Sequence, residues 1–345
     1  MEAHLETRIF GTTEYDIQQA AEILKSGGLV AFPTETVYGL GANALDPEAV
    51  GKVYAAKGRP SDNPMIAHIS SKDDMTALTE GITPDVEKLM EAFWPGPLTM
   101  VVPAKPVVPR VTTGGLDTVA VRMPSDPVAS AIIAAAGVPI AAPSANLSGR
   151  PSPTTGRHVV DDLDGRIDAI VIGSDCQVGI ESTVIDMTTD QPMILRPGII
   201  TAAQLSEALG KEVTFDPALM QKPDTFNNGG LLETGSDFKP KSPGMKYKHY
   251  APKAEMIIYQ GSREAVTMAM AEEKMKRIQW GQKVEIIMYD DDHPEEAAKE
   301  FFAKLRACDK ADVEVILAAA LREDGIGFAV MNRMFKSAGY NIINV

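Results

Sequence analysis

The stretch "PEAVGKVYAAKGRPSDNPMIAHIS", residues 47–70, shows the succession of helix and strand that decides the fold. Its first half predicts a helix, with Pro47 in the first turn and Gly58 at the end. Its last part, "NPMIAHIS", predicts a buried strand. A polar turn stiffened by Pro60 and Pro64 lies between them, and the strand contains a histidine. The stretch is therefore either an ordinary turn with an incidental histidine or one wall of a site for an anion.

The same succession continues along the chain and predicts two domains. Before about residue 210, strands outnumber helices, which is typical of an α+β domain around one large twisted sheet. After Ala254 the chain alternates strand and helix three times, which predicts a small parallel α/β domain. Residues 211–252 show no sustained period and are rich in Pro, Gly, Asn and Lys, as linkers are. We therefore expect an α/β (α+β) protein with a catalytic domain in residues 1–210 and a Rossmann-like domain in residues 253–345.

Composition narrows the class of protein. With 345 residues and 44% hydrophobic residues, the chain is long enough for two domains. It has no apolar run near the roughly 20 residues that cross a membrane, and its N-terminus lacks the layout of a signal peptide. Its two cysteines, Cys176 and Cys308, are far apart and predict reduced thiols in a cytoplasmic protein. A formal net charge of −14 disfavours tight, non-specific binding of nucleic acid.

Several well-known motifs are absent from the sequence. There is no GxxxxGK[ST] phosphate loop, no HExxH, no GxSxG and no cluster of Cys and His with metal spacing. "YGLGANAL" contains GxG but lacks the third glycine of the dinucleotide motif. If the protein handles a nucleotide, it uses a different scaffold.

Polar side chains instead gather where predicted strands end. Thr34 and Thr36 directly follow a strand, which is where α/β sheets place ligands, although threonine hydroxyls also stabilise ordinary turns. Lys57 and Arg59 stand at a helix C-terminus, where the dipole already favours cations. Against that plain interpretation, the neighbouring prolines hold the loop stiff, which lowers the entropy cost of presenting Arg59 to a ligand.

Arg122 gives the sharpest local signal. It lies in the apolar strand "TVAVRMP", where an unpaired guanidinium is costly to bury, so it needs an anion from the protein or from a ligand. "APSANLSGRPSPTT" adds hydroxyls and accessible backbone N–H groups, and "LRPG" adds Arg196. Cations and hydroxyls at strand ends, with no evident nucleophile and base, suit phosphoryl or nucleotidyl chemistry.

The motifs, taken in order, resemble the YrdC-type threonylcarbamoyl-AMP synthases in their long, two-domain form. They are "FPTETVYGLG", "KGRPSDNP", "FWPGPLT", "TVAVRMP", "PIAAPSANLSGRPSPT", "ESTVID", "LRPG", "SPGMKYKHYAP" and "GIGFAVMNR". The resemblance implies that L-threonine, bicarbonate (or CO2) and ATP give L-threonylcarbamoyladenylate and pyrophosphate, for N6-threonylcarbamoyladenosine in tRNA. It also implies Mg2+ bound through the ATP phosphates, with no ligand from a protein side chain.

The resemblance further implies a set of site residues. Those expected in catalysis are Lys57 and Arg59. Those expected at ATP are Arg59, Asn63, Thr118, Ser144, Ser152, Arg196 and, by hypothesis, Tyr247. Those expected at L-threonine are Thr36, His68, Arg122 and Ser182. Residues 211–252 would then serve as a linker and a lid over the nucleotide site, because closure protects a mixed anhydride from water.

Two other functions stay open at this point. One is a double-stranded RNA- or tRNA-binding module, which the net charge of −14 counts against. The other is an ATP-dependent carbamoylating enzyme that uses a different amine. The sequence leaves open the oligomeric state, the role of the C-terminal domain, and transient contact with tRNA or tRNA-modification proteins.

Overall fold

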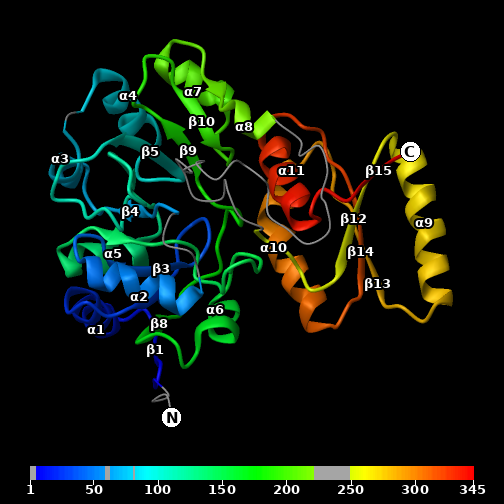
Figure 1. The fold of residues 1–345 in the computed structure, drawn as a ribbon, viewed down its shortest axis with the longest axis horizontal. Helices are drawn as coiled ribbons and strands as arrows, with labels where there is room; N and C mark the ends of the chain where they lie inside the picture. The colour runs from blue at the N-terminus through cyan, green and yellow to red at the C-terminus, as the bar shows by residue number, and fades with distance from the viewer. Residues whose placement is uncertain (1–4, 59–62, 81, 221–248) are drawn as a thin grey trace.

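The computed structural model describes residues 5–58, 63–80, 82–220 and 249–345, which form two domains with one sheet each (Figure 1). The N-terminal sheet has eleven strands in the order β1-β8-β2-β3-β7-β4-β6-β5-β9-β10-β11 and mixes parallel and antiparallel pairs. The C-terminal sheet has four strands in the order β13-β14-β12-β15, all parallel. The predicted α/β (α+β) class, with a large mixed sheet and a smaller parallel one, is confirmed.

The strands of the N-terminal sheet are short. In chain order they are β1 Arg8–Phe10, β2 Val30–Phe32, β3 Gly39–Asn43, β4 Ile66–His68, β5 Leu98–Pro103, β6 Thr118–Arg122, β7 Ile140–Ala141, β8 Ala169–Val171, β9 Thr183–Asp186, β10 Met193–Arg196 and β11 Thr214–Phe215. The helices of this domain are α1 Glu14–Lys25, α2 Pro47–Lys57, α3 Met75–Leu78, α4 Pro84–Phe93, α5 Pro127–Ala136, α6 Gly156–Leu163, α7 Ala202–Leu209 and α8 Pro217–Met220, with a 3₁₀ turn at Lys72–Asp74.

Capping residues set the helix ends that the sequence predicts. Asp46 caps α2 by accepting hydrogen bonds from the first-turn backbone, and Gly58 ends it with φ of 62°. Thr83 caps α4 ahead of Pro84, as predicted. Because these signals are local in the chain, the sequence places both helices correctly.

Helices cover the two faces of the large sheet unequally. One face packs along most of the sheet against α2, α3, α4, α6 and α7 in the main hydrophobic core. On the other face α1 and α5 cover only the end formed by β2, β7 and β8. Over β4, β5, β6, β9 and β10 that second face carries a small apolar cluster to which no helix contributes: Ile66, Val101, Ala120, Val184 and Leu195. No helix within the described ranges covers this part of the second face, which we call the uncovered face, and a ligand can approach it there.

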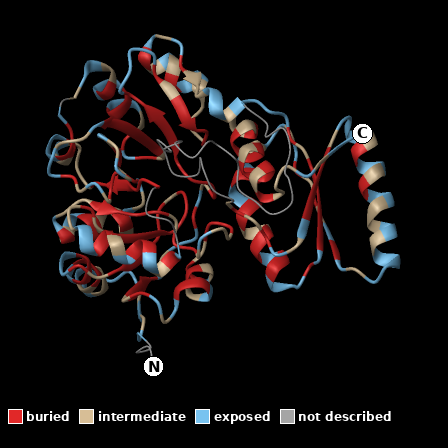
Figure 2. Cartoon of the chain, viewed as in Figure 1, coloured by how far each residue is buried: buried red, intermediate tan, exposed pale blue. Residues whose placement is uncertain are grey.

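The C-terminal domain closes one side of that region. It consists of β12 Glu255–Gln260, α9 Arg263–Gln279, β13 Val284–Ile287, α10 Pro294–Lys310, β14 Val315–Ala319, α11 Gly325–Ser337 and β15 Ile342–Asn344. Helix α9 lies on the side away from the N-terminal domain, while α10 and α11 lie between the two sheets (Figure 1). The core beneath α10 and α11 also includes Val37 and Ile180 of the N-terminal domain, so the domains share buried apolar surface (Figure 2).

Several elements escaped the sequence prediction. The short edge strands β1, β11 and β15, the glycine-containing strand β3 and the helix α6 were not predicted. Strand β11 and helix α8 also lie within the stretch predicted as linker, so ordered structure of the N-terminal domain continues to Met220. Among the described residues, no helix is long and apolar enough to cross a membrane.

Candidate functional site

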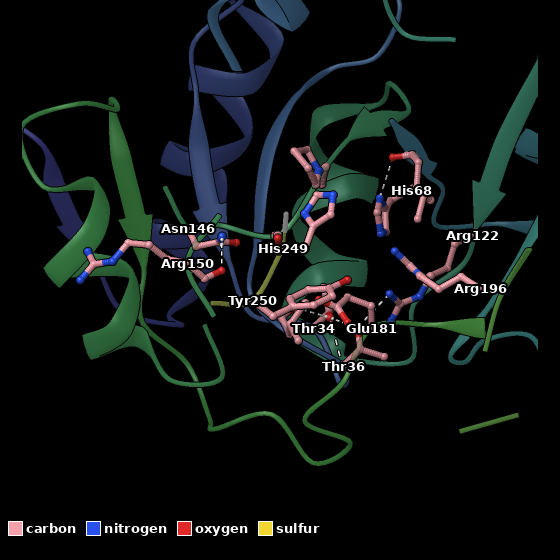
Figure 3. A pocket seen from close by; sticks show the side chains of 16 residues that line it. Thr34, Thr36, His68, Arg122, Asn146, Arg150, Glu181, Arg196, His249 and Tyr250 are labelled. Carbon is pink, nitrogen blue, oxygen red and sulfur yellow. Dashed lines mark hydrogen bonds between the residues drawn. The ribbon is translucent and has the colours of Figure 1, made fainter. Parts of the chain in front are cut away.

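A pocket lies on the uncovered face of the large sheet, and His249 and Tyr250, which precede the C-terminal domain, form part of its lining (Figure 3). Its polar lining comes from Thr34, Thr36, His68, Arg122, Ser144, Asn146, Arg150, Glu181, Arg196, His249 and Tyr250. His68, Arg122 and Arg196 stand on one side of it, and Asn146 and Arg150 on the other (Figure 3). Ile66, from the small apolar cluster, forms part of its wall.

Strand register brings the cationic side of the pocket together. His68 on β4 pairs with Arg122 on β6, and Arg122 pairs with Thr99 on β5. Thr99 in turn pairs with Val184 on β9. Residues directly opposite in neighbouring strands share a face of the sheet. The side chains of His68, Arg122 and Thr99 therefore form one row across three strands.

A β-bulge adds Arg196 to this row. Strict alternation along β10 would put Arg196 on the same face as Ile194, which is in the main core. The register instead shifts between these two residues, so that Arg196 pairs with Val184. Bulges re-aim side chains in this way. The guanidinium of Arg196 donates to the Ser182 carbonyl and hydroxyl, both at 3.0 Å, and lines the pocket.

Arg122 has an acidic partner of its own. Its guanidinium lies 2.7 Å from Glu35 Oε1 and donates to Thr36 Oγ1 at 2.9 Å. Burial, the largest single effect, would raise the pKa of Glu35, but the charge and hydrogen bond of Arg122 together with backbone hydrogen bonds hold that pKa below its ordinary value. A guanidinium carries five N–H donors. Because Arg122 lines the pocket while Glu35 lies behind it, Arg122 still presents donors to a ligand.

His68 is neutral and has a defined tautomer. Burial, and then the charge of Arg122, lowers the pKa of His68 to about 3. Its Nδ1 lies 3.1 Å from the carbonyl of Ile66 and 3.3 Å from that of Ile140. Carbonyls only accept, so Nδ1 must carry the proton, and Nε2 is left as an acceptor.

Another part of the lining is Glu181, which is buried two residues before β9. Its Oε1 accepts a hydrogen bond from Ser152 Oγ at 2.5 Å. Its Oε2 accepts from Nε of Arg333 at 3.1 Å, and Arg333 belongs to α11 of the C-terminal domain. Burial would raise the pKa of Glu181, but the charges of Arg333 and Arg196 lower it, so the side chain is a carboxylate.

Lys57 forms hydrogen bonds to the backbone of the loop that follows β7. Its ammonium donates to the backbone carbonyl of Asn146 at 2.5 Å and to that of Ser144. Ser148 N donates back to the Lys57 carbonyl at 2.9 Å. Lys57 thus fixes the backbone from which Ser144 and Asn146 reach the pocket, and its predicted catalytic role stays a prediction.

The structure brings most of the predicted residues to the pocket, though not all of them into its lining. Thr36, His68, Arg122, Ser144 and Arg196 line it. Lys57, Ser152 and Ser182 stand one hydrogen bond behind lining residues.

Two further predicted residues lie outside the lining. Thr118 opens β6, two pleats from Arg122 on the same face of the sheet. Asn63 is buried beside α2, with its carbonyl accepting from Tyr54 at 2.9 Å. Arg59 and Tyr247 are outside the described residues.

Sequence reasoning assigned no role to several residues of the site, although it noted some of them among the polar residues at strand ends. Glu181 immediately precedes a predicted site residue, and a carboxylate beside an apolar strand was the available signal. His249 and Tyr250 line the pocket and follow the selected Tyr247 in the same aromatic segment. Glu35 and Arg333 act through contacts that join distant parts of the chain, so neither role could be assigned from the sequence.

Metal ligands are scarce in the described part of the chain. No group of three or more His, Cys, Asp or Glu side chains there could hold a metal ion. The carboxylates next to the pocket, Glu35 and Glu181, each pair with an arginine. The arrangement offers cations and hydroxyls, which suit an anionic ligand.

Fold and site together define a two-domain α/β protein with a pocket lined by arginines and hydroxyls of the N-terminal domain and by His249 and Tyr250. A family model described as "Telomere recombination" matches residues 22–198, and one described as "Threonylcarbamoyl-AMP synthase, C-terminal domain" matches residues 200–339. The chain belongs to the threonylcarbamoyl-AMP synthase family and is therefore an enzyme.

Individual relatives agree with the family models over the whole chain. The threonylcarbamoyl-AMP synthase of Pyrococcus abyssi is 46% identical over 342 residues, covering 96% of each chain. That of Bacillus subtilis is 44% identical over 350 residues, covering 96% of this chain and 95% of the relative. The crystal structure of P. abyssi Sua5 complexed with L-threonine has a TM-score of 0.89 and 46% identity, and the match covers 98% of this chain and 100% of that one.

Proposed function

We propose that this chain makes L-threonylcarbamoyladenylate and pyrophosphate from L-threonine, bicarbonate or CO2, and ATP. The observation that carries the proposal is the row of His68, Arg122 and Arg196 on one uncovered sheet face, opening into a single pocket. The P. abyssi relative, solved with L-threonine, supports an amino acid as one occupant.

The cationic row suits threonine. Arg122, held by Glu35, is the partner we assign to the threonine carboxylate, with Thr36 and Ser182 beside it. His68 Nε2 then accepts a hydrogen bond from the threonine amine or hydroxyl. A pKa of about 3 makes His68 too weak a base to remove a proton near neutral pH, so its role is to orient the substrate.

The reaction needs positioning and charge more than covalent catalysis. The threonine amine attacks the carbon of CO2 and loses a proton, giving a carbamate. A carbamate oxygen then bonds to the α-phosphorus of ATP, and the bond from that phosphorus to the pyrophosphate oxygen breaks. Arg196 is the described cation we assign to the developing charge, with Ser144 and Ser152 nearby.

The remaining assignments follow the family resemblance. Arg59, Asn63, Thr118 and Tyr247 are proposed for ATP, with Lys57 and Arg59 aiding the anions. ATP would enter as its Mg2+ complex, with the metal held through the phosphates, since the carboxylates beside the pocket are already paired with arginines. A cytoplasmic location, direct contact with tRNA and a lid in residues 211–252 stay predictions.

A pyrophosphate-release assay tests the proposal. We expect release that requires ATP, bicarbonate and L-threonine, with L-serine and other amino acids giving much less. Release with another amine would instead favour a different carbamoylating enzyme. A tRNA titration at moderate salt, run beside it, tests the binding-module alternative. Tight tRNA binding without pyrophosphate release would contradict the proposal.

A further inference from the structure

We propose that the C-terminal domain completes the nucleotide side of the pocket through two buried positioning residues, Arg333 and Arg306. Neither residue lines the pocket, and each acts on residues that do the binding. The inference rests on the proposed function, because it takes Ser152 and Arg196 as the ATP side. The family model identifies residues 200–339 as the C-terminal domain of the family and says nothing of its role at the pocket.

Arg333 forms hydrogen bonds to residues just before β9 and just after β10, the strand that ends with Arg196. It is fully buried on α11. Besides its bond to the Glu181 carboxylate, it donates to the Glu181 carbonyl at 3.3 Å and to the carbonyl of Pro197. Glu181 precedes β9 and Pro197 follows β10. One guanidinium from the second domain therefore holds the bulged strand β10 against β9.

The positive charge of Arg333 also affects how much charge Arg196 can offer to a ligand. Glu181 is a buried carboxylate near two arginines, and its ion pair is with Arg333. Within the described ranges, no carboxylate lies at ion-pair distance from Arg196, whose guanidinium bonds to Ser182. Arg196 is the other arginine whose charge lowers the pKa of Glu181, so without Arg333 it would be the arginine left to pair with Glu181. Pairing of Glu181 with Arg196 would neutralise the charge that Arg196 offers to a phosphate.

Arg306 holds the same wall from the backbone. On α10, it donates to the carbonyl of Pro151 through Nε at 3.1 Å and through a terminal nitrogen at 2.6 Å. It also pairs with Asp162 at 2.8 Å. Pro151 precedes Ser152, whose hydroxyl bonds to Glu181. The C-terminal domain thus fixes Ser152 at its backbone through Arg306 and at its side chain through Arg333.

The contact between the domains is close enough to transmit these constraints. Gly179 has φ of +83°, and a Cβ there would overlap the backbone of Ala298 and Lys299 on α10. Gly179 N donates to the Thr36 carbonyl at 3.1 Å, so the same loop continues into the pocket rim. Buried Ile180 lies next to Glu181 and packs into the core under α10 and α11. A helix of the second domain therefore rests directly on the rim.

The test measures ATP affinity by calorimetry, with Mg2+ and without threonine, in Arg333→Met, Glu181→Gln and the double variant Arg333→Met/Glu181→Gln. We expect Arg333→Met to weaken ATP binding at least tenfold and threonine binding less than threefold. The double variant, which removes both charges, should recover most of the ATP affinity, since Arg196 is then free again. The measurement is made at about pH 8. Burial and the neighbouring arginines lower the pKa of Lys336 to about 7, so at that pH this side chain adds little positive charge near Glu181.

Arg277→Gln is the matched control, because Arg277 is also an ion-paired arginine of the C-terminal domain but lies on α9, away from the pocket. Unchanged ATP affinity in Arg333→Met, or equal loss in the single and double variants, would overturn the inference. If Arg333→Met does not fold, Arg333→Lys carries the test. It keeps the charge but cannot make all the guanidinium bonds to the Glu181 and Pro197 carbonyls, so ATP binding at least threefold weaker, with threonine binding less affected, supports the inference, and ATP binding within threefold of wild type contradicts it. A wild-type chain that binds no ATP would instead contradict the proposed function.

Discussion

Two buried Arg–Glu pairs flank the pocket, and they are arranged in opposite ways. On the threonine side Arg122 faces the pocket and Glu35 stands behind it, 2.7 Å away. On the nucleotide side Glu181 faces the pocket and Arg333 stands behind it, 3.1 Å away. The first pair lies wholly in the N-terminal domain, whereas the second joins the two domains.

Under the proposed function, this difference describes how one protein prepares two anion subsites in one pocket. A cation backed by an acid can take a carboxylate without leaving a net charge buried when the subsite is empty. An acid backed by a second-domain cation holds a hydroxyl and leaves a neighbouring arginine unpaired for a phosphate. Under the proposed assignment, the threonine subsite is complete within the N-terminal domain, and the nucleotide subsite depends on both domains.

Replacing Arg122, the pocket-facing arginine, should have the largest effect on ligand binding and on stability. Arg122→Met leaves Glu35 buried without its partner, which costs about 3–5 kcal/mol of stability for pairs of this kind. We expect threonine affinity to fall about a hundredfold or more, while ATP affinity changes little. Calorimetry with each ligand and urea unfolding would measure both effects. Arg122→Lys, which keeps the charge, is the control for folding, and equal loss of threonine and ATP binding would mean that Arg122 is misassigned.

Replacing Glu35, the acid behind Arg122, should strengthen stabilisation by L-threonine instead of weakening it. Glu35→Gln keeps the shape but leaves Arg122 with an uncompensated charge, at a cost of about 1–3 kcal/mol of stability. A threonine carboxylate would then replace the lost acid. We therefore expect L-threonine to raise the melting temperature of Glu35→Gln more than that of the wild type. An equal or smaller shift would show that Arg122 does not meet the carboxylate.

Arg122 and Arg333 also show how much of the site could be predicted from the sequence. Arg122 was found because a cation interrupts an apolar strand, and that signal survives in the structure. Arg333 stands between Met331 and Met334 in a helix and gives the same signal, but nothing local names Glu181, 152 residues away, as its partner. Alternation predicts the face of His68 and Arg122, whereas Arg196 reaches the pocket through a bulge. Long-range pairing and register shifts are set by tertiary packing.

The low pKa of His68 predicts a pH dependence of stability that belongs to the threonine side. Burial, and then Arg122, lowers this pKa from 6.5 to about 3. Between these values the unfolded chain binds a proton that the native protein does not. The contribution is therefore fully present above about pH 6.5 and is lost as the pH falls, by up to about 1.4 kcal/mol per pH unit.

His68→Gln should remove this slope. Urea unfolding of wild type and variant at about pH 5 and about pH 6.5 measures it as a difference. His158, whose pKa is also lowered, to about 4, is present in both proteins and cancels. Parallel pH profiles for the two proteins would mean that His68 is protonated in the native state.

Thr118 should give the smallest effect and test how far the nucleotide side extends along β6. Its side chain shares a face with Arg122, two pleats away, and lies outside the pocket lining. A single neutral hydrogen bond contributes about 0.5–1.5 kcal/mol. Thr118→Val, which keeps the shape of the side chain, should therefore weaken ATP binding about two- to twelvefold and leave threonine binding unchanged. Unchanged ATP affinity would remove Thr118 from the nucleotide side, whereas weaker threonine binding would mean that the boundary between the two subsites lies elsewhere on β6.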